Sequence, residues 1–126
     1  MSFLDKYASL ILGLTRIVAG LLFLEHGTAK LLHYPVMPMF AEGPLPPVTL
    51  ASGVIELVGG ALIALGFFSR SAAFVCSGMM AIAYFMVHFP QGFFPILNGG
   101  ELAIVYCFLF LYLAAAGPGS LALNRK

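Results

Sequence analysis

The stretch GLLFLEHGTAKLL, from Gly20 to Leu32, decides the fold that this sequence predicts. It is apolar enough to lie in a bilayer, yet it contains Glu25, His26 and Lys30 within six positions. An ionisable side chain at the centre of a membrane costs at least about 2.5 kcal/mol. Three of them in so short a run indicate a polar site. We therefore expect the other helices to pack around this segment and to supply partners for its polar groups.

The composition of the whole chain indicates that its main partner is the lipid bilayer. Of its 126 residues, 61% are hydrophobic and only 9% are charged, whereas soluble proteins have about 25% charged residues. So few charges cannot cover a water-facing surface. The length predicts a single domain over residues 1–126. The formal net charge of +1 leaves no basic patch, so we expect no nucleic-acid partner.

Neither the cysteines nor the N-terminal segment points to another class of protein. Cys76 and Cys107 stand alone in apolar runs, and no CxxC pair indicates a dithiol centre or a zinc knuckle. The apolar run after Lys6 resembles a signal peptide at first, but Arg16 interrupts it and no small-residue cleavage site follows. We interpret it as a retained membrane helix.

Four segments are apolar enough to cross a hydrocarbon core, which takes about 20 residues of helix. We expect these helices over residues 7–32, 48–68, 72–89 and 100–116, separated by loops rich in proline and glycine. Short connections make consecutive helices antiparallel neighbours. The predicted fold class is therefore all-α, an integral membrane four-helix up-down bundle. Gly13, Gly20 and Gly27 recur every seven residues and form a seam for close packing.

The distribution of basic residues predicts the orientation. If the chain crosses four times, one side carries most of the basic residues near helix ends: Lys6, Arg70, Arg125 and Lys126. The other side carries Glu42. Because lysine and arginine favour the cytoplasmic side, we expect both termini to be cytoplasmic.

Most ionisable groups fall in the outer half of this bundle. Counting 1.5 Å per residue from the outer helix ends places His26 roughly 10 Å, Lys30 roughly 5 Å and Glu56 roughly 12 Å below the surface. His88 and Glu101 fall within the outermost turn or two of their helices. Each helix thus contributes an ionisable group, and we expect these five side chains to face one another as a catalytic set.

Arg16 lies deeper on the same helix. It precedes Lys30 by two seven-residue intervals, so the two side chains lie near the same stripe of the helix. It is a candidate to bind a ligand of the site. The alternative is a structural role, in which the guanidinium anchors backbone carbonyls or pairs with Glu56.

Tyr84 and Asn98 complete the candidate ligand-binding residues. Tyr84 shares a helical stripe with His88, which equally fits packing. Asn98 precedes Glu101 by three positions, as in a capping box, and capping is compatible with a role in the site. Lys30 and His88 have simpler alternatives too, since each lies near a membrane interface.

These residues together resemble the DoxX family of small bacterial membrane proteins. The resemblance rests on Arg16, on the HGxxK core of GLLFLEHGTAKL, on Glu56 before a glycine pair, on His88 and on NGGE at Asn98–Glu101. It covers nearly the whole chain and implies a multipass protein of the bacterial cytoplasmic (inner) membrane. Some members are subunits of thiosulfate:quinone oxidoreductases, and others are linked to oxidative-stress or quinone responses. Glu25 departs from the family pattern, which has apolar residues at that position.

The first functional hypothesis is a component of a membrane redox system that binds a quinone or a similar small molecule. A quinone has two carbonyls that accept hydrogen bonds and take up protons on reduction. His26, Lys30 and His88 could donate, while Glu56 and Glu101 could relay protons. No electron carrier is visible in the sequence, so this hypothesis includes a redox enzyme as partner.

Two other hypotheses remain open at this point. One is a non-catalytic assembly partner or scaffold for other enzymes, and a homo-oligomer through the Glu25 face, about 100° around the helix from His26, fits with it. The other is a metal or haem site, for which two histidines and two carboxylates suit zinc or iron. The residues of that site would be His26, Glu56, His88 and Glu101.

Overall fold

The computed structural model describes residues 1–41 and 43–126, except for the side chain of Ala41. Glu42, which the sequence places on the outer side, lies outside the described residues. Within those ranges every regular element is helical, and no strand is present. The all-α class is therefore confirmed for this part of the chain.

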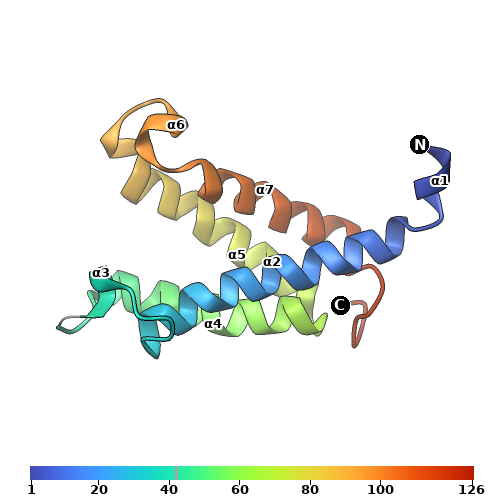
Figure 1. Cartoon of the computed structure of the whole chain (residues 1–126), viewed down its shortest axis with the longest axis horizontal. Coiled ribbons are helices and arrows are strands. Elements are labelled where there is room, and N and C mark those ends of the chain that lie inside the picture. The colour runs from blue at the N-terminus through green and yellow to red at the C-terminus, as the bar shows by residue number, and fades with distance from the viewer. Residues whose placement is uncertain (42) are drawn as a thin grey trace.

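Four long helices make up the body of the molecule (Figure 1). They are α2 (Ala8–Leu31), α4 (Pro47–Leu65), α5 (Ser69–Ala83) and α7 (Glu101–Ala116). Helix α5 continues through a π-helical turn, η1 (Tyr84–His88), and a 3-10 turn, η2 (Phe89–Gln91). By length and composition α2, α4 and the run Ser69–Gln91 can each cross a membrane, whereas α7 is a shorter apolar helix. The expected helices are all present, with ends that differ by a few residues.

Local sequence explains where these helices begin and end. Pro47 occupies the first turn of α4, where its missing N–H costs nothing. Gly66 ends the helix in the left-handed conformation, with φ of 66°. Three short helices that the sequence did not predict lie in the connections: α1 (Ser2–Asp5), α3 (Pro38–Ala41) and α6 (Pro95–Asn98).

The bundle consists of two closely packed pairs, α2 with α4 and α5 with α7, which α4 and α5 join. The predicted glycine seam explains the first pair. A Cβ on Gly20 would lie 2.6 Å from the Ala64 nitrogen, and one on Gly27 would lie 2.5 Å from the Leu57 nitrogen. Only glycine permits this approach, so the backbones of α2 and α4 touch directly.

An aromatic cluster connects the two pairs at mid-depth. The ring of Phe23 on α2 packs edge-on against Tyr106 and Phe110 of α7, with centroids 5.4 and 4.9 Å away. The two α7 rings stack on each other at 5.3 Å. All three side chains are buried. This cluster separates the polar groups at one end of the bundle from those at the other.

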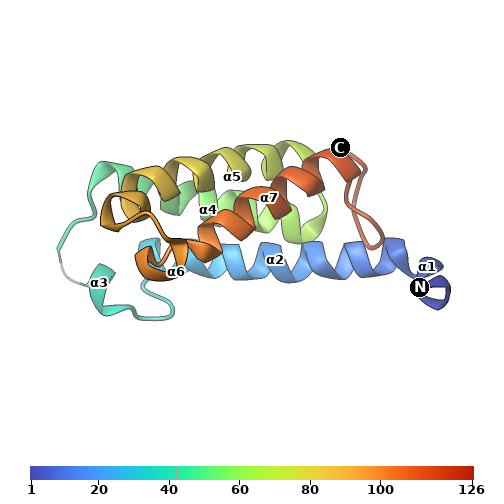
Figure 2. The ribbon, with the colours of Figure 1, turned by 90° about the horizontal axis from the view of Figure 1, so that it is seen from above.

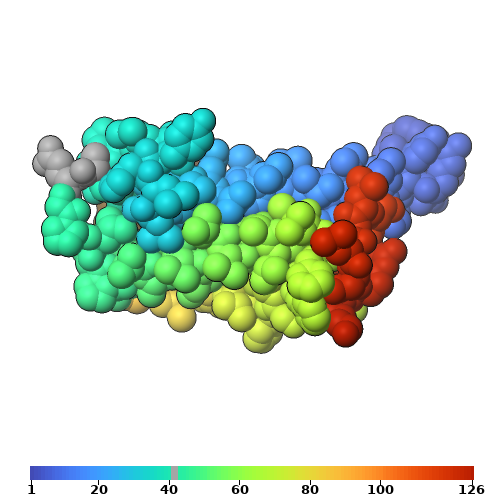
Figure 3. Space-filling view, turned by 90° about the horizontal axis from the view of Figure 1, so that it is seen from below, coloured from blue at the N-terminus to red at the C-terminus, as the bar shows by residue number. Residues whose placement is uncertain are grey.

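The two ends of the bundle differ. The N- and C-termini lie at one end, and α3 and α6 lie towards the other (Figure 1 and Figure 2). From the end with the termini, the two pairs diverge towards the end with α3 and α6 (Figure 1). The C-terminal tail lies across the first end, beside the last turns of α4 (Figure 3). The backbone of the tail is hydrogen-bonded to the end of α4, because the Asn124 N–H donates to the Gly66 carbonyl at 3.1 Å. We call the end with the two termini the terminal end, and the end with α3 and α6 the open end.

Candidate functional site

A buried ion pair joins two of the predicted site residues near the open end. The Lys30 ammonium on α2 lies 2.8 Å from Oε1 of Glu56 on α4. It also donates to the Ser52 hydroxyl at 2.9 Å, one turn before Glu56, and lies 5.7 Å from the ring centroid of Phe40 in α3. Because the glycine seam brings α2 and α4 into direct contact, the Lys30 side chain is long enough to reach the Glu56 carboxylate on the neighbouring helix.

Glu56 is incompletely partnered. The residue is 3% exposed, and its Oε1 accepts no hydrogen bond from any described residue although Lys30 is close. Both statements hold, because charge attraction depends on distance whereas a hydrogen bond also needs alignment. A carboxylate can accept about four hydrogen bonds. Glu56 therefore keeps unused acceptor capacity inside the bundle.

His26 lies on the side of α2 that faces α7. Its ring meets the ring of Tyr106 edge-on at 6.4 Å, and its Nδ1 lies 2.9 Å from the Leu22 carbonyl. A carbonyl oxygen only accepts, so Nδ1 carries the hydrogen. In the neutral imidazole Nε2 is then the proton acceptor, and the ring is half-buried.

A second polar cluster lies at the open end of the other pair. His88 is bound in the same way as His26, with Nδ1 3.1 Å from the Asn98 carbonyl. The Asn98 amide donates to the Tyr84 hydroxyl at 3.1 Å and to the Gly92 carbonyl at 2.9 Å. The π-helical turn carries both Tyr84 and His88, whose rings stack at 6.3 Å. Such turns often occur at functional sites.

The capping-box expectation for Asn98 and Glu101 is wrong. The Asn98 side chain accepts from the Gly100 N–H at 2.8 Å, but α7 begins only at Glu101, with Gly100 as its N-cap. Gly99, with φ of 75°, turns the chain between them. Glu101 is therefore the first helical residue and is exposed, rather than the third residue reaching back to a cap.

The predicted catalytic set is thus divided between places. Lys30 and Glu56 form one group, and His88 joins the other cluster, while His26 contacts Tyr106. Among the described residues no hydrogen bond or ion pair connects Glu101 to either group. The catalytic roles of these residues remain predictions.

The residues that would hold a metal are not gathered. In residues 1–41 and 43–126, no three His, Cys, Asp or Glu side chains come together in a way that could hold an ion. The alternative set of two histidines and two carboxylates is therefore not formed. It comprised His26, Glu56, His88 and Glu101.

Arg16 lies at the terminal end, away from both clusters, and is completely buried. Its guanidinium has five N–H groups, and the structure shows five hydrogen bonds of 2.8–2.9 Å to backbone carbonyls. The acceptors are Ile63, Ala64, Pro118, Ser120 and Leu121. The geometry favours the structural alternative over ligand binding, because no N–H remains for a ligand.

Two residues near the site have no clear signal in the sequence. Tyr106 lies within the apolar run of α7 and reads as core, yet its ring contacts the ring of His26. Phe40 lies in a proline-rich connection and covers Lys30 only because α3 folds back. Only the three-dimensional arrangement reveals either contact.

The amino-acid sequence is similar to those of known proteins. A protein of Haemophilus influenzae described as uncharacterized is 47% identical over 130 residues, covering all of this chain and 97% of its own length. Inner membrane protein YqjF of Escherichia coli is 30% identical over 114 residues, which cover 87% of this chain and 86% of that protein. No solved structure matches the chain.

The family match begins in the first turn of α2, covers all of α4 and α5, and ends just after the π-helical turn η1. The DoxX family matches residues 11–89, more than half of the chain. The apolar helices and the inner-membrane relative together make this a multipass protein of the bacterial cytoplasmic membrane. The expected resemblance is confirmed: the chain belongs to the DoxX family.

Proposed function

We propose that this protein is a component of a membrane redox system that binds a quinone or a similar aromatic molecule in the outer half of a four-helix bundle. In this proposal all four long helices span the membrane and both termini are cytoplasmic. The observation that carries it is the Glu56 carboxylate, which is 3% exposed and held by a single lysine. Buried carboxylates without a full set of partners are rare outside functional sites.

The Lys30–Glu56 pair suits the chemistry of a quinone. Reduction to the quinol takes up two electrons and two protons. The Lys30 ammonium has three N–H donors and uses one of them on the Ser52 hydroxyl, so another could bind a quinone carbonyl. Glu56 could carry protons to that oxygen. The electrons would come from a partner redox enzyme.

The two histidines suit the reduced form of the same ligand. In each, Nδ1 donates to a backbone carbonyl, so Nε2 of the neutral ring accepts. A quinol hydroxyl donates, and it would therefore bind His26 or His88 by Nε2. The neighbouring ring of Tyr84, which is half-buried, offers a flat apolar surface for an aromatic ligand.

The orientation in this proposal rests on the basic residues at the terminal end. Lys6 lies just before α2, Arg70 lies in the first turn of α5, and Arg125 and Lys126 lie in the C-terminal tail, which hydrogen-bonds to Arg70. The positive-inside tendency then makes the terminal end cytoplasmic. The Lys30–Glu56 pair is consequently in the outer half.

The test is to purify the protein in mild detergent and identify the molecules that stay bound, then to titrate it with a membrane quinone. We expect Glu56→Gln to weaken quinone binding by at least about tenfold, as for loss of a charge-assisted hydrogen bond. Glu25→Gln is the matched control, because Glu25 is an exposed carboxylate on the same helix pair. Absence of any quinone binding in the wild-type protein would exclude the proposal.

One observation favours an assembly role as a second candidate. Glu25 is exposed on α2, within a segment that can cross a membrane. A carboxylate facing lipid is costly, so a second copy of this chain or a partner enzyme would cover it. Light scattering of the protein in detergent, compared with Glu25→Gln, tests this: a dimer that the substitution dissociates supports it, and a monomer in both argues against self-association.

A further inference from the structure

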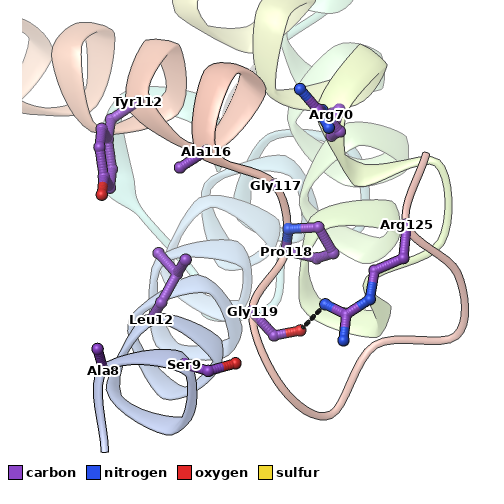
Figure 4. Close-up of a pocket in the computed structure, with 10 residues that line it drawn as sticks. All are labelled: Ala8, Ser9, Leu12, Arg70, Tyr112, Ala116, Gly117, Pro118, Gly119 and Arg125. Carbon is purple, nitrogen blue, oxygen red and sulfur yellow. Dashed lines mark hydrogen bonds between the residues drawn. The ribbon is translucent and has the colours of Figure 1, made fainter. Parts of the chain in front are cut away.

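A pocket lined by two arginines lies at the terminal end of the bundle (Figure 4). Its volume is about 340 Å³, and it lies between the first turns of α2 and the last turns of α7. The turn Gly117–Pro118–Gly119 closes one side, and Arg70 and Arg125 line it from two other segments. No lining residue is acidic.

Both arginines are held in place by backbone carbonyls. Arg70 donates through Nε to the Ala114 carbonyl at 2.9 Å and through Nη2 to the Ala115 carbonyl at 3.0 Å. Arg125 donates through Nη1 to the Gly119 carbonyl, as Figure 4 shows. Each guanidinium has five N–H groups. Among the described residues these contacts use two of them in Arg70 and one in Arg125, so several donors remain at the pocket.

The buried Arg16 adds to the positive charge of this end. Its Nε donates to the carbonyl of Pro118, which itself lines the pocket. Three guanidiniums therefore surround one closing turn, and no acidic side chain lines the pocket to balance them. An anion with several acceptor oxygens is the ligand that this arrangement favours.

An apolar groove lies between the same two helices, one turn deeper. Its volume is about 500 Å³, and its walls are mostly aliphatic residues of α2 and α7. It begins at Ile11, next to Leu12 of the pocket, and at Leu109, one turn before Tyr112 of the pocket. A polar hollow at the membrane surface is thus followed by an apolar hollow that runs inward along the same helices.

We propose that the two hollows form one site for an anionic phospholipid, with the phosphate at Arg70 and Arg125 and an acyl chain in the groove. Basic pockets between membrane helices bind such headgroups. A free phosphate would explain the arginines but not the adjoining groove, whereas a phospholipid explains both. The headgroup pocket shares no residue with the proposed quinone site, whereas the inner end of the groove reaches Tyr106, which contacts His26.

The test is native mass spectrometry of the protein in mild detergent, titrated with phosphatidylglycerol, with phosphatidylcholine and with inorganic phosphate. Each arginine near a membrane surface contributes about fivefold to the binding of an anionic lipid. We expect Arg125→Gln to weaken phosphatidylglycerol binding about fivefold, and Arg70→Gln/Arg125→Gln about 30-fold. Lys6→Gln is the matched control, because it removes a charge at the same end but does not line the pocket.

A second variant tests the acyl chain. Val18 lines the groove and is exposed, so Val18→Trp fills the groove with little effect on the core. It should weaken phosphatidylglycerol binding while circular dichroism stays unchanged. Equal effects of Lys6→Gln and Arg125→Gln would overturn the site in favour of general charge attraction. Inorganic phosphate that binds as tightly as the lipid, unaffected by Val18→Trp, would overturn the phospholipid as occupant.

Discussion

Two cations on one helix, Arg16 and Lys30, have been buried in different ways. They lie fourteen residues apart on α2 and on similar faces, because fourteen residues make about four turns. Arg16 has all five N–H groups on backbone carbonyls. Lys30 has one hydroxyl, one carboxylate and one aromatic ring, and its side chain remains 15% exposed.

The difference shows what each end of the bundle is built to do. A guanidinium is planar, and fixed backbone carbonyls can accept hydrogen bonds from all of its N–H groups. An ammonium is a compact charge at the end of a flexible alkyl chain. At the terminal end, the Arg16 guanidinium links α2 to α4 and to the C-terminal tail through its hydrogen bonds. The open end holds an ion pair in which the carboxylate is only partly satisfied, and which a ligand or proton could still engage.

The largest expected effect is at Arg16. Arg16→Met removes the donors of five carbonyls, and we expect the free energy of unfolding to fall by more than about 4 kcal/mol. Arg16→Lys keeps the charge but supplies only three N–H groups, so it should rescue only part of the loss. The measurement is unfolding by titration from mild detergent into sodium dodecyl sulfate. If Arg16→Met unfolds at the wild-type midpoint, this linking role is wrong.

An intermediate effect is expected at the ion pair. Glu56→Gln and Lys30→Met should each lower the free energy of unfolding by about 2–3 kcal/mol, because each leaves a partner charge unpaired inside the bundle. The double variant should be more stable than the sum of the two losses allows, since no charge is left unpaired. Strict additivity in the same detergent titration would show that the pair does not interact. Arg16 variants offer no such compensation, because backbone carbonyls cannot be removed.

The smallest effects on stability are expected from substitutions of glycine by alanine on the helices. Gly27→Ala places a methyl 2.5 Å from the Leu57 nitrogen, and we expect it to push α2 from α4 and cost about 1–3 kcal/mol. Gly78→Ala on α5 is the matched control, because its methyl would meet no atom within 4 Å among the described residues. That change should stabilise the helix by up to about 1 kcal/mol. Thermal unfolding followed by circular dichroism distinguishes the two signs.

The fold could largely be predicted from the sequence because lipid imposes a simple rule. Apolar runs of sufficient length become helices, and proline and glycine mark their ends, as Pro47 and Gly66 do for α4. The glycine seam was also readable, since Gly20 and Gly27 meet the α4 backbone as expected. The short helices of the connections were not predicted, because they depend on contacts made after the bundle has formed.

The candidate site was only partly predictable, for reasons of geometry. Lys30 and Glu56 met because their helices are in backbone contact, which the sequence indicated. His88 was placed on a regular helix, but the π-helical turn changes the direction of every side chain that it carries. The divergence of the two helix pairs (Figure 1) has no signature in a single sequence, and it divides a set that depth alone would put together.

Arg16 also sets an order for the biosynthesis of the protein. Its carbonyl partners at Pro118, Ser120 and Leu121 are synthesised more than one hundred residues after it. At translation rates of about 5–20 residues per second, the guanidinium waits roughly 5–20 s for them. During that interval the guanidinium lacks three of its five acceptors, and an incompletely paired charge in the membrane is costly. We therefore expect α2 to reach its final depth only after the last helix and the tail have been synthesised, because three of the five carbonyl acceptors of Arg16 lie in the tail.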